Sequence, residues 1–253
     1  IHEADGLICL DYNDPSRVGK QLAPVVSQAE GTTIMIAHHR DPSDIADILF
    51  SEITASSTAE LVWCFIQDLG WNDRMDQWTA EALYCGMVTD TGSFRFPATS
   101  SRVHRIAADL IDRGARNAWV HQQVYDGNTE SRIRLHGYAL SEKLELNYEH
   151  GFALLSLTAD ELARFNYKKG DTEGLVNEGL SVKGINISIF LSEKDEKVKM
   201  SFRSKGDYPV NELASSHFQG GGHLNAAGGI SHDDVESTLV KLRALLPDWI
   251  QSL

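Results

Sequence analysis

Short apolar runs in the first third of the chain are each followed directly by polar side chains. Residues 7–10 are apolar and end at Asp11, and residues 32–36 are largely apolar and lead into 37–39. Such runs predict buried strands of a parallel sheet. Between them, Asp14 and Pro15 supply the N-cap and the first-turn proline of a short helix, which predicts a right-handed strand–helix–strand unit. Apolar residues at helical spacing predict four further helices, at residues 57–69, 76–89, 101–113 and 118–125.

The periodicity changes in the second half of the chain. Residues 129–148 carry Ile133, His136, Leu140 and Leu144 at spacings of three and four, which predicts a long helix leading out of the first domain. Beyond it the pattern predicts strands at 152–157, 184–191 and 197–203, a polar hairpin turn at 192–196, and helices at 159–165, 172–180, 210–218 and 233–246. We therefore predict an α/β protein of two domains, residues 1–127 and 149–253, joined by a linker helix at 128–148.

Composition and charge narrow the class of protein. Of the 253 residues, 42% are hydrophobic and 23% are charged, and no apolar run approaches the length of a membrane span. The net charge of -13 argues against a long basic groove for duplex nucleic acid, whereas a few cations can still neutralise a small phosphorylated substrate. Cys9, Cys64 and Cys85 lack metal-ligand spacing and predict buried free thiols in a reducing compartment, hence a cytoplasmic protein. The first residues show neither a secretory signal nor an initiator Met, so we expect the chain to begin within a longer protein.

Three side chains stand where an α/β sheet usually places its ligands. Asp11 and His38 follow the two predicted strands, and Asp90 lies near the end of a predicted helix that Gly92 terminates. Taken singly, Asp11 is equally compatible with a turn or cap residue, and the pair His38 and His39 with an ordinary loop. Together, carboxylate and imidazole groups form the donor set that suits manganese or magnesium.

A glycine-rich segment near the end of the chain is a second candidate. Gly220, Gly221 and Gly222 precede His223. Successive glycines let backbone amides approach a phosphate, and the histidine adds a hydrogen bond or a charge. The alternative is that the segment is only a turn.

The order of these motifs resembles that of the DHH phosphoesterase family. Residues 10–17 look like the family's second motif, residues 37–39 its namesake third and residues 89–92 its fourth. The second half resembles a DHHA1 domain through residues 173–177, 201–205 and 220–223. The resemblance covers essentially the whole chain, and within the family the bacterial oligoribonuclease and phosphoadenosine-phosphate phosphatase branch is the most similar.

The resemblance implies a parallel-sheet DHH domain joined by a long helix to a smaller DHHA1 domain with a mixed sheet. It also implies two manganese ions, with magnesium as a possible substitute, bridged by Asp11. His38 and Asp90 would complete the shell of the second ion, and His39 would contact the scissile phosphate, which makes Asp11, His39 and Asp90 the catalytic residues.

The same resemblance implies that the second domain holds the substrate. The residues implied are Arg203, Ser204, Lys205, Gly220, Gly221, Gly222 and His223. The expected substrates are short RNA, dinucleotides or 3'-phosphoadenosine 5'-phosphate. The oligomeric state stays open, with a homodimer as one alternative. A solvated charge at a strand end remains the alternative for Arg203.

Two departures from the family predict impaired activity. The family's first motif, a histidine followed by two aspartates, is absent from this sequence, and neither 39–41 nor 232–234 follows a strand in the order needed to replace it. Ala37 also stands where the namesake triplet has an aspartate. The alternatives are a protein that binds nucleotides without hydrolysing them, and a manganese-dependent inorganic pyrophosphatase, whose second domain lacks the Gly-Gly-Gly-His pattern.

Overall fold

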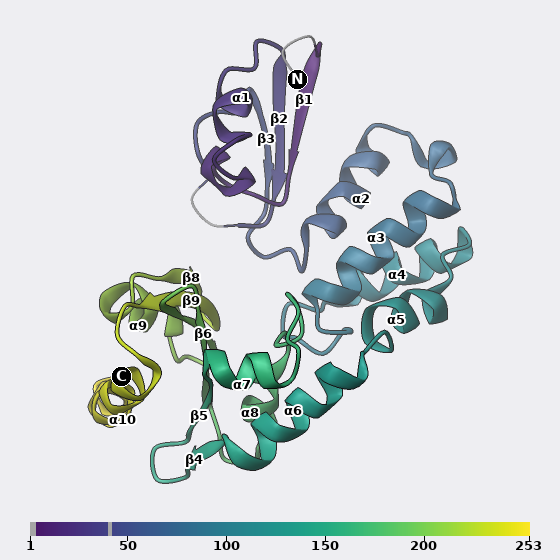
Figure 1. Cartoon of the computed structure of the whole chain (residues 1–253). Coiled ribbons are helices and arrows are strands. Elements are labelled where there is room, and N and C mark those ends of the chain that lie inside the picture. The colour runs from purple at the N-terminus through teal and green to yellow at the C-terminus, as the bar shows by residue number, and fades with distance from the viewer. Residues whose placement is uncertain (1–3, 40–41) are drawn as a thin grey trace. The chain divides into compact units, whose positions relative to one another are not determined.

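The computed structural model describes residues 4–39 and 42–253. The residues outside this description are Ile1, His2, Glu3, Arg40 and Asp41. The predictions for the start of the chain and for most of the stretch 39–41 therefore concern residues that the structure does not describe. The chain forms two compact units, Ile1–Gly127 and Asn128–Leu253 (Figure 1). None of the described helices is both long enough and apolar enough to cross a membrane.

A parallel three-stranded sheet opens the first unit. Its strands are β1 (Gly6–Leu10), β2 (Thr32–Ala37) and β3 (Ile48–Ser51), in that order across the sheet. One face packs on the 3-10 helix η1 (Pro15–Val18), which Asp14 caps as predicted, and on α1 (Ala23–Ser27). The parallel pairing of β1 with β2 confirms the predicted strand–helix–strand unit.

One expectation for this sheet was wrong, and one strand was missed. Strand β1 is not fully buried, because Ile8 and Leu10 are 54% and 46% exposed at the edge of the described sheet. Strand β3 was not predicted, because its short apolar stretch offers too few residues to show a period.

Four helices complete the first unit, and each lies within one residue of its predicted bounds. They are α2 (Thr58–Asp68), α3 (Gln77–Asp90), α4 (Ser101–Asp112) and α5 (Asn117–Tyr125), with a 3-10 turn η2 (Asn72–Arg74) between the first two. Side-chain oxygens of Ser57, Asp76 and Ser100 accept hydrogen bonds from backbone N–H groups at the starts of α2, α3 and α4. These caps fix where the helices begin.

The second unit is built on a six-stranded mixed sheet. Its strands are β4 (Glu145–Asn147), β5 (Phe152–Leu157), β6 (Ile187–Lys194), β7 (Lys197–Ser204), β8 (Gly221–His223) and β9 (Ala226–Ser231), in the order β4-β5-β6-β7-β9-β8. Only β5 and β6 run parallel. Together with the parallel sheet of the first unit, this mixed sheet confirms the predicted α/β fold class.

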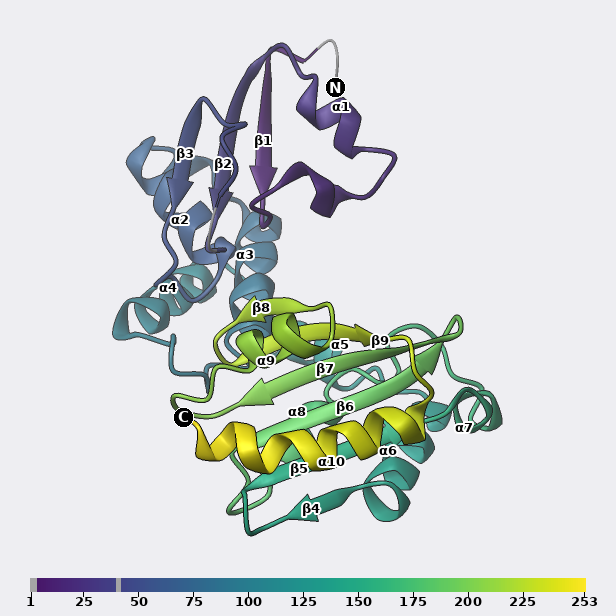
Figure 2. The same cartoon turned by 90° about the vertical axis from the view of Figure 1, so that its left-hand side faces the viewer.

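The helices of the second unit divide between the two faces of its sheet. They are α6 (Glu130–Glu142), α7 (Ala159–Arg164), α8 (Leu175–Ser181), α9 (Val210–His217) and α10 (Val235–Gln251). One face buries its apolar residues against α9 and α10, the latter lying along the sheet in Figure 2. The opposite face packs on α6, α7 and α8 through residues of β5 and β6. On that second face, β7, β9 and β8 present mainly polar and small residues.

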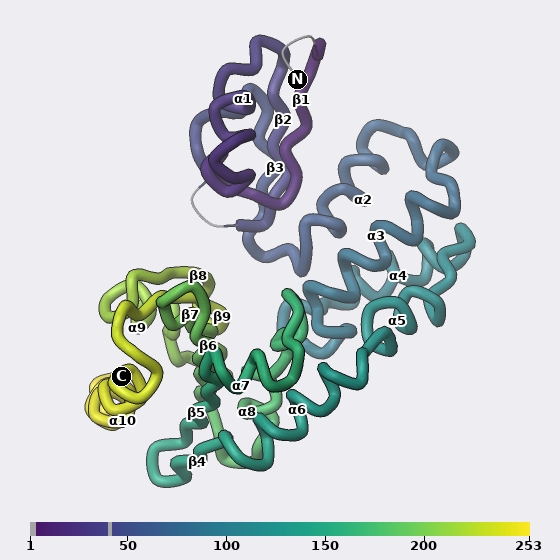
Figure 3. Tube along the Cα trace, in the orientation of Figure 1, coloured from purple at the N-terminus to yellow at the C-terminus, as the bar shows by residue number. Residues whose placement is uncertain are grey.

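Three predictions for the second half need correction. The helix expected over 129–148 ends at Glu142, because the following residues pair with β5 as strand β4, and this pairing outweighs their helical spacing. The expected turn at 192–196 is tighter, since both strands continue until only Asp195 and Glu196 remain, each with a positive φ (54° and 58°). The glycine-rich segment, for which a simple turn was the alternative, forms the hairpin β8–β9 (Figure 3).

The cysteines match their prediction only in part. All three are free thiols, and Cys9 is buried, but Cys64 and Cys85 are half-buried.

Candidate metal and phosphate site

Asp11, His38 and His39 converge at the carboxyl ends of β1 and β2. One donor atom from each lies within 4.8 Å of the other two. His39 Nε2 is 3.4 Å from Asp11 Oδ1, and His38 Nε2 is 3.8 Å from the same oxygen. Adjacent parallel strands end at one edge of the sheet, which explains why residues 27 positions apart in the sequence meet here.

Asp90 joins this cluster from the last residue of α3. Its Oδ2 lies 3.8 Å from His38 Nε2. Burial and the nearby negative charge of Asp11 raise the pKa of the Asp90 carboxyl, and the two histidines oppose part of that rise. The structure thus brings together the four residues that the sequence singled out for metal and phosphate chemistry.

The donor set fits a divalent metal ion. His38 Nδ1 lies 3.2 Å from the backbone oxygen of Ala55, and a proton on Nδ1 would leave Nε2 with its lone pair toward Asp11 and Asp90. The Nε2–oxygen separations of 3.4 to 3.8 Å exceed normal hydrogen-bond lengths. Metal bonds of about 2.1 Å hold neighbouring donors roughly 3 to 3.5 Å apart, close to the spacing seen here.

One polar contact at the site was not foreseen from the sequence. Thr58, the first residue of α2, donates from Oγ1 to Asp11 Oδ1 at 2.7 Å. Asp11 itself has a left-handed backbone (φ 64°), a conformation that aspartate tolerates better than most residues. Thr58 therefore orients the carboxylate of Asp11, which lies one residue beyond the end of β1.

Hydrogen bonds to a buried carboxylate fix the start of α2 next to that contact. Glu60 is 2% exposed, and its carboxylate accepts hydrogen bonds from the backbone N–H of Ser56 at 2.7 Å and from Arg102 Nε at 2.7 Å. The run Ser-Ser-Thr-Ala-Glu contains the Ser-x-x-Glu signature of a capped helix start. That signature locates the helix start, but nothing in it indicates the distant aspartate.

Ala37 supplies no polar group to the cluster. It is fully buried and packs in the apolar cluster that includes Cys9, Val26 and Met35.

In the second unit, the strand register aligns the predicted substrate residues on one face of the sheet. Arg203 on β7 pairs with Ala226 on β9, which pairs in turn with His223 on β8. The adjacent row on the same face joins Ser201, Gly228 and Gly221. Directly paired residues share a face. The row with Arg203 and His223 therefore lies beside a row that contains Gly221 and Gly228, whose lack of side chains leaves room above the sheet.

A cavity of about 400 Å³ adjoins this face. Its walls include Asn177 and Val176 of α8, the loop residue Thr172, and Ser201 and Arg203 of β7. Among the residues that the structure describes, no carboxylate lies within ion-pair distance of Arg203, whose Nη1 donates to the Phe202 carbonyl at 2.9 Å. Burial lowers the pKa of the Arg203 guanidinium. A largely buried cation without a counter-ion is a suitable partner for a phosphate.

Ser204 and Lys205 take part in contacts within the protein. The Ser204 hydroxyl donates to the Tyr208 carbonyl and accepts from Asn225 Nδ2, at 2.7 and 2.8 Å. Lys205 Nζ donates to the Ile185 carbonyl at 3.2 Å. These contacts stabilise the loops around β7, and a substrate role for either residue stays a prediction.

The three glycines of the hairpin are not equivalent. A Cβ on Gly220 would lie 2.0 Å from the Gly228 oxygen, and one on Gly222 would lie 2.4 Å from the Ala226 oxygen. A Cβ on Gly221 would meet nothing within 4 Å. Gly220 and Gly222 are therefore required by strand packing, whereas Gly221 only keeps the exposed face clear.

Comparisons with known proteins agree with this arrangement. The DHHA1 domain profile matches residues 153–252. An exopolyphosphatase-related protein from Bacteroides fragilis is 38% identical and superposes with a TM-score of 0.94 over 99% of this chain and 73% of its own. The chain belongs to the DHH/DHHA1 phosphoesterase family.

Relatives in this family carry the activity that the motifs suggested. The bifunctional oligoribonuclease and PAP phosphatase NrnA of Bacillus subtilis is 28% identical over 96% of this chain and 76% of its own length. The Thermus thermophilus protein of the same name is 32% identical over 88% of this chain and 64% of its own length. The family resemblance inferred from the sequence is confirmed.

Proposed function

We propose that the protein hydrolyses phosphoester bonds in short oligoribonucleotides, dinucleotides or 3'-phosphoadenosine 5'-phosphate, with manganese as the natural metal and magnesium as a possible substitute. The observation that carries this proposal is the convergence of Asp11, His38 and His39 within 4.8 Å, with Asp90 beside His38. The names of the NrnA relatives support the substrate class.

Each residue of the cluster has a distinct task in this proposal. Asp11, His38 and Asp90 would hold the metal. Bound divalent ions supply positive charge to the phosphate and activate water for in-line displacement. His39, whose side chain is 20% exposed, donates a hydrogen bond to a phosphate oxygen from the open side of the cluster.

The number of metal-donor side chains in the cluster also affects the expected rate of hydrolysis. Within residues 4–39 and 42–253, the cluster offers two carboxylates and two imidazoles. With Asp11, His38 and Asp90 assigned to one ion, His39 is the one donor of this cluster left, and its proposed task is the phosphate. We propose that this stretch of chain holds one ion firmly and turns over slowly, and that Ala37 lowers the rate further because it cannot orient a ligand.

The second unit binds the nucleotide portion of the substrate in this proposal. Arg203 meets a phosphate, Asn177 offers an amide to a base or a sugar, and Gly221 leaves the sheet face open beside them. His223 lies on the same face and adds a further polar contact. The net charge of -13 makes long duplex nucleic acid an unsuitable partner. A cytoplasmic location stays a prediction.

The test combines metal binding with hydrolysis. The wild type, Asp90→Asn and His38→Gln are titrated with Mn²⁺ by calorimetry and assayed on a diribonucleotide, 3'-phosphoadenosine 5'-phosphate and pyrophosphate. Asp112→Asn is the matched control, because it removes an exposed carboxylate from the first unit outside the cluster. We expect Mn²⁺ affinity to fall at least about tenfold in the two site variants and to stay unchanged in the control.

The same experiment separates the alternatives. Tight dinucleotide binding without hydrolysis under any metal condition would favour a nucleotide-binding protein. Faster cleavage of pyrophosphate than of the nucleotides would favour an inorganic pyrophosphatase. Mn²⁺ affinity that is equal in all four proteins would refute the metal site itself.

A further inference from the structure

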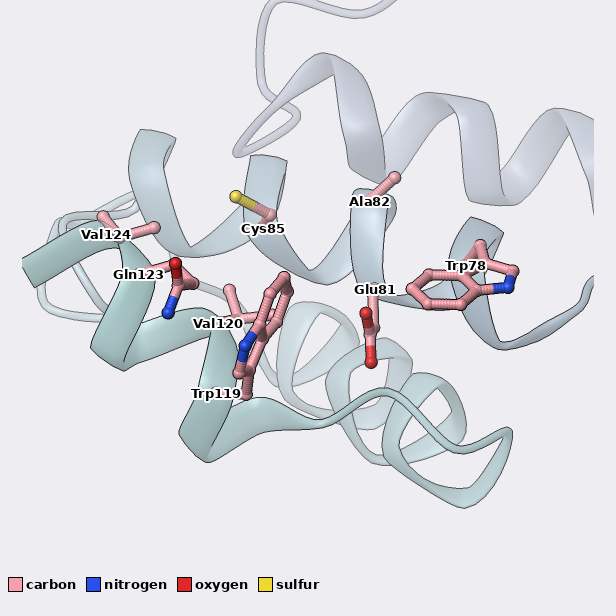
Figure 4. A pocket seen from close by; sticks show the side chains of 8 residues that line it. All are labelled: Trp78, Glu81, Ala82, Cys85, Trp119, Val120, Gln123 and Val124. Atoms are coloured by element: carbon pink, nitrogen blue, oxygen red, sulfur yellow. The ribbon is translucent and has the colours of Figure 1, made fainter.

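Two cavities among the described residues differ in the character of their walls. The cavity between α3 and α5, of about 300 Å³, is mainly apolar, with Trp78 and Trp119 beside it (Figure 4). The one carboxylate among its lining residues, Glu81, is already paired with Arg116. The cavity of about 400 Å³ beside Arg203 is mainly polar. It is therefore the better match for a charged nucleotide.

One wall of the polar cavity is a loop without apolar side chains. Residues 168–174 have the sequence Lys-Lys-Gly-Asp-Thr-Glu-Gly, and Thr172, Glu173 and Gly174 line the cavity. Gly170 and Gly174 have φ values of 102° and 93°, and a Cβ on either would meet nothing within 4 Å. Apolar packing therefore does not fix this loop, and its position depends on polar contacts.

Two side chains of α6 hold the backbone of this loop. Arg132 donates from Nη1 to the Gly170 carbonyl and from Nη2 to the Glu173 carbonyl, each at 2.9 Å. His136, one helical turn further along α6, places Nε2 at 2.8 Å from the Asp171 carbonyl. A carbonyl oxygen only accepts, so this nitrogen carries the proton. Three carbonyls of the loop are thereby attached to one face of the helix.

We propose that Arg132 is a positioning residue for the nucleotide cavity. Neither Arg132 nor His136 is among the described residues that line the cavity, so both act through the loop. They hold Thr172 and Glu173 at the cavity wall before a ligand arrives, and binding then requires less ordering. The planar guanidinium suits this task, because its two Nη atoms reach two carbonyls at once, whereas a lysine ammonium is a single compact donor group. The inference rests on the nucleotide role proposed for this cavity.

Calorimetric titration of the full chain with a diribonucleotide, in excess EDTA to prevent hydrolysis, tests the proposal. Arg132→Lys keeps the charge but loses the contact with two carbonyls, and it should raise the dissociation constant about fivefold. Arg134→Lys is the matched control on the same helix, because Arg134 is 69% exposed and pairs only with the exposed Glu130 at 2.8 Å. Its dissociation constant should stay within about twofold of the wild type. In the Mn²⁺-dependent assay, Arg132→Lys should raise KM and leave kcat within about twofold, since the proposed metal ligands belong to the first unit.

A double variant shows whether Arg132 acts through the loop. Thr172→Val removes a hydroxyl from the cavity wall, and it should weaken diribonucleotide binding about threefold in the wild type. Combined with Arg132→Lys, it should have less than about half of that effect, because the wall is then no longer held in place. Additive effects of the two substitutions, or no effect of Thr172→Val in either protein, would overturn the positioning role.

The same titrations separate this inference from the proposed function. If Arg203→Ala weakens binding and Arg132→Lys does not, the cavity binds the nucleotide but its attachment to α6 has no part in binding, which overturns the inference alone. If Arg203→Ala leaves binding unchanged, the proposed nucleotide cavity is wrong, and the inference is wrong with it. An equal loss of affinity in Arg134→Lys would also overturn the inference, since any change in α6 would then weaken binding.

Discussion

The hydrogen bond from Thr58 to Asp11 should set the metal affinity of the site. Thr58→Val removes the donor while keeping the shape of a side chain that is 6% exposed. A hydrogen bond to a charged acceptor contributes about 1.5 to 3 kcal/mol. The Asp11 side chain is 57% exposed, so water recovers part of that contribution and a net loss of about 1 kcal/mol is reasonable. Mn²⁺ should then bind about fivefold more weakly.

Calorimetric titration with Mn²⁺ at pH 7 measures this loss directly. Thr58→Ser keeps the hydroxyl and should bind within about twofold of the wild type. Thr79→Val is the matched control, because Thr79 Oγ1 also donates to an aspartate, Asp76, at 2.7 Å in the same unit but at the start of α3. Its affinity for Mn²⁺ should not change.

Two outcomes would contradict the reasoning, each in a different way. If Thr58→Val bound Mn²⁺ like the wild type while Asp11→Asn did not, the hydrogen bond would have no part in orienting the carboxylate. If Asp11→Asn also bound like the wild type, the proposed metal ligand would be wrong, whatever Thr58 does.

Further predictions concern the second unit and the acid stability of the first. Arg203→Ala should weaken dinucleotide binding at least about tenfold in fluorescence titrations, because a charged contact is lost, whereas Lys199→Ala on the same face of β7 should not. Gly221→Ala should melt like the wild type yet bind the dinucleotide more weakly, whereas Gly222→Ala, at φ 150°, should lose about 1 to 3 kcal/mol of stability in urea unfolding. Hydrogen bonds from Arg116 lower the pKa of Glu81 from 4.5 to about 2. The stabilising effect of Glu81 is therefore present above pH 4.5 and lost as the pH falls toward 2, so urea unfolding of Glu81→Gln should approach that of the wild type across this range.

Local signals account for most of what the sequence predicted correctly. Helices α2, α3 and α4 begin where a Ser or Asp caps them, and such caps are visible within four residues of sequence. Asp11 and His38 were identifiable because each follows an apolar run, and parallel strands end at a common edge.

Long-range contacts account for most of what the sequence missed. Thr58 lies 47 residues from Asp11, and no spacing rule connects a helix start with the end of a strand in another part of the chain. Strand β4 likewise exists only because β5 pairs with it, so its residues read as the end of a helix. The hairpin β8–β9 was not predicted, because glycine is in general unfavourable in strands, whereas here Gly220 and Gly222 allow the chain to approach β9 closely.

The alternation of apolar and polar side chains along β7 could have shown that the predicted substrate residues lie on different faces of the sheet. Met200 and Phe202 belong to the apolar core on one face of the sheet, so Ser201 and Arg203 must lie on the other. By the same period Ser204 shares the core face, where it is buried and bonded to neighbouring loops. The family motif at residues 201–205 therefore combines residues of the core face with residues of the open face. Only the alternation of side chains along the strand distinguishes the two groups.

One short segment supports two residues of the candidate metal site, His38 and Asp11. The Ala55 carbonyl meets His38 Nδ1 at 3.2 Å, and the Thr58 hydroxyl meets Asp11 at 2.7 Å. Asp11 and His38 lie just beyond the ends of β1 and β2, and both of these contacts come from residues outside the sheet. The buried carboxylate of Glu60 holds this segment to the start of α2. The spacing between the His38 imidazole and the Asp11 carboxylate therefore depends on the conformation of residues 55–60 as well as on the sheet, so a change in that segment should alter the candidate metal site without removing any of its proposed donors.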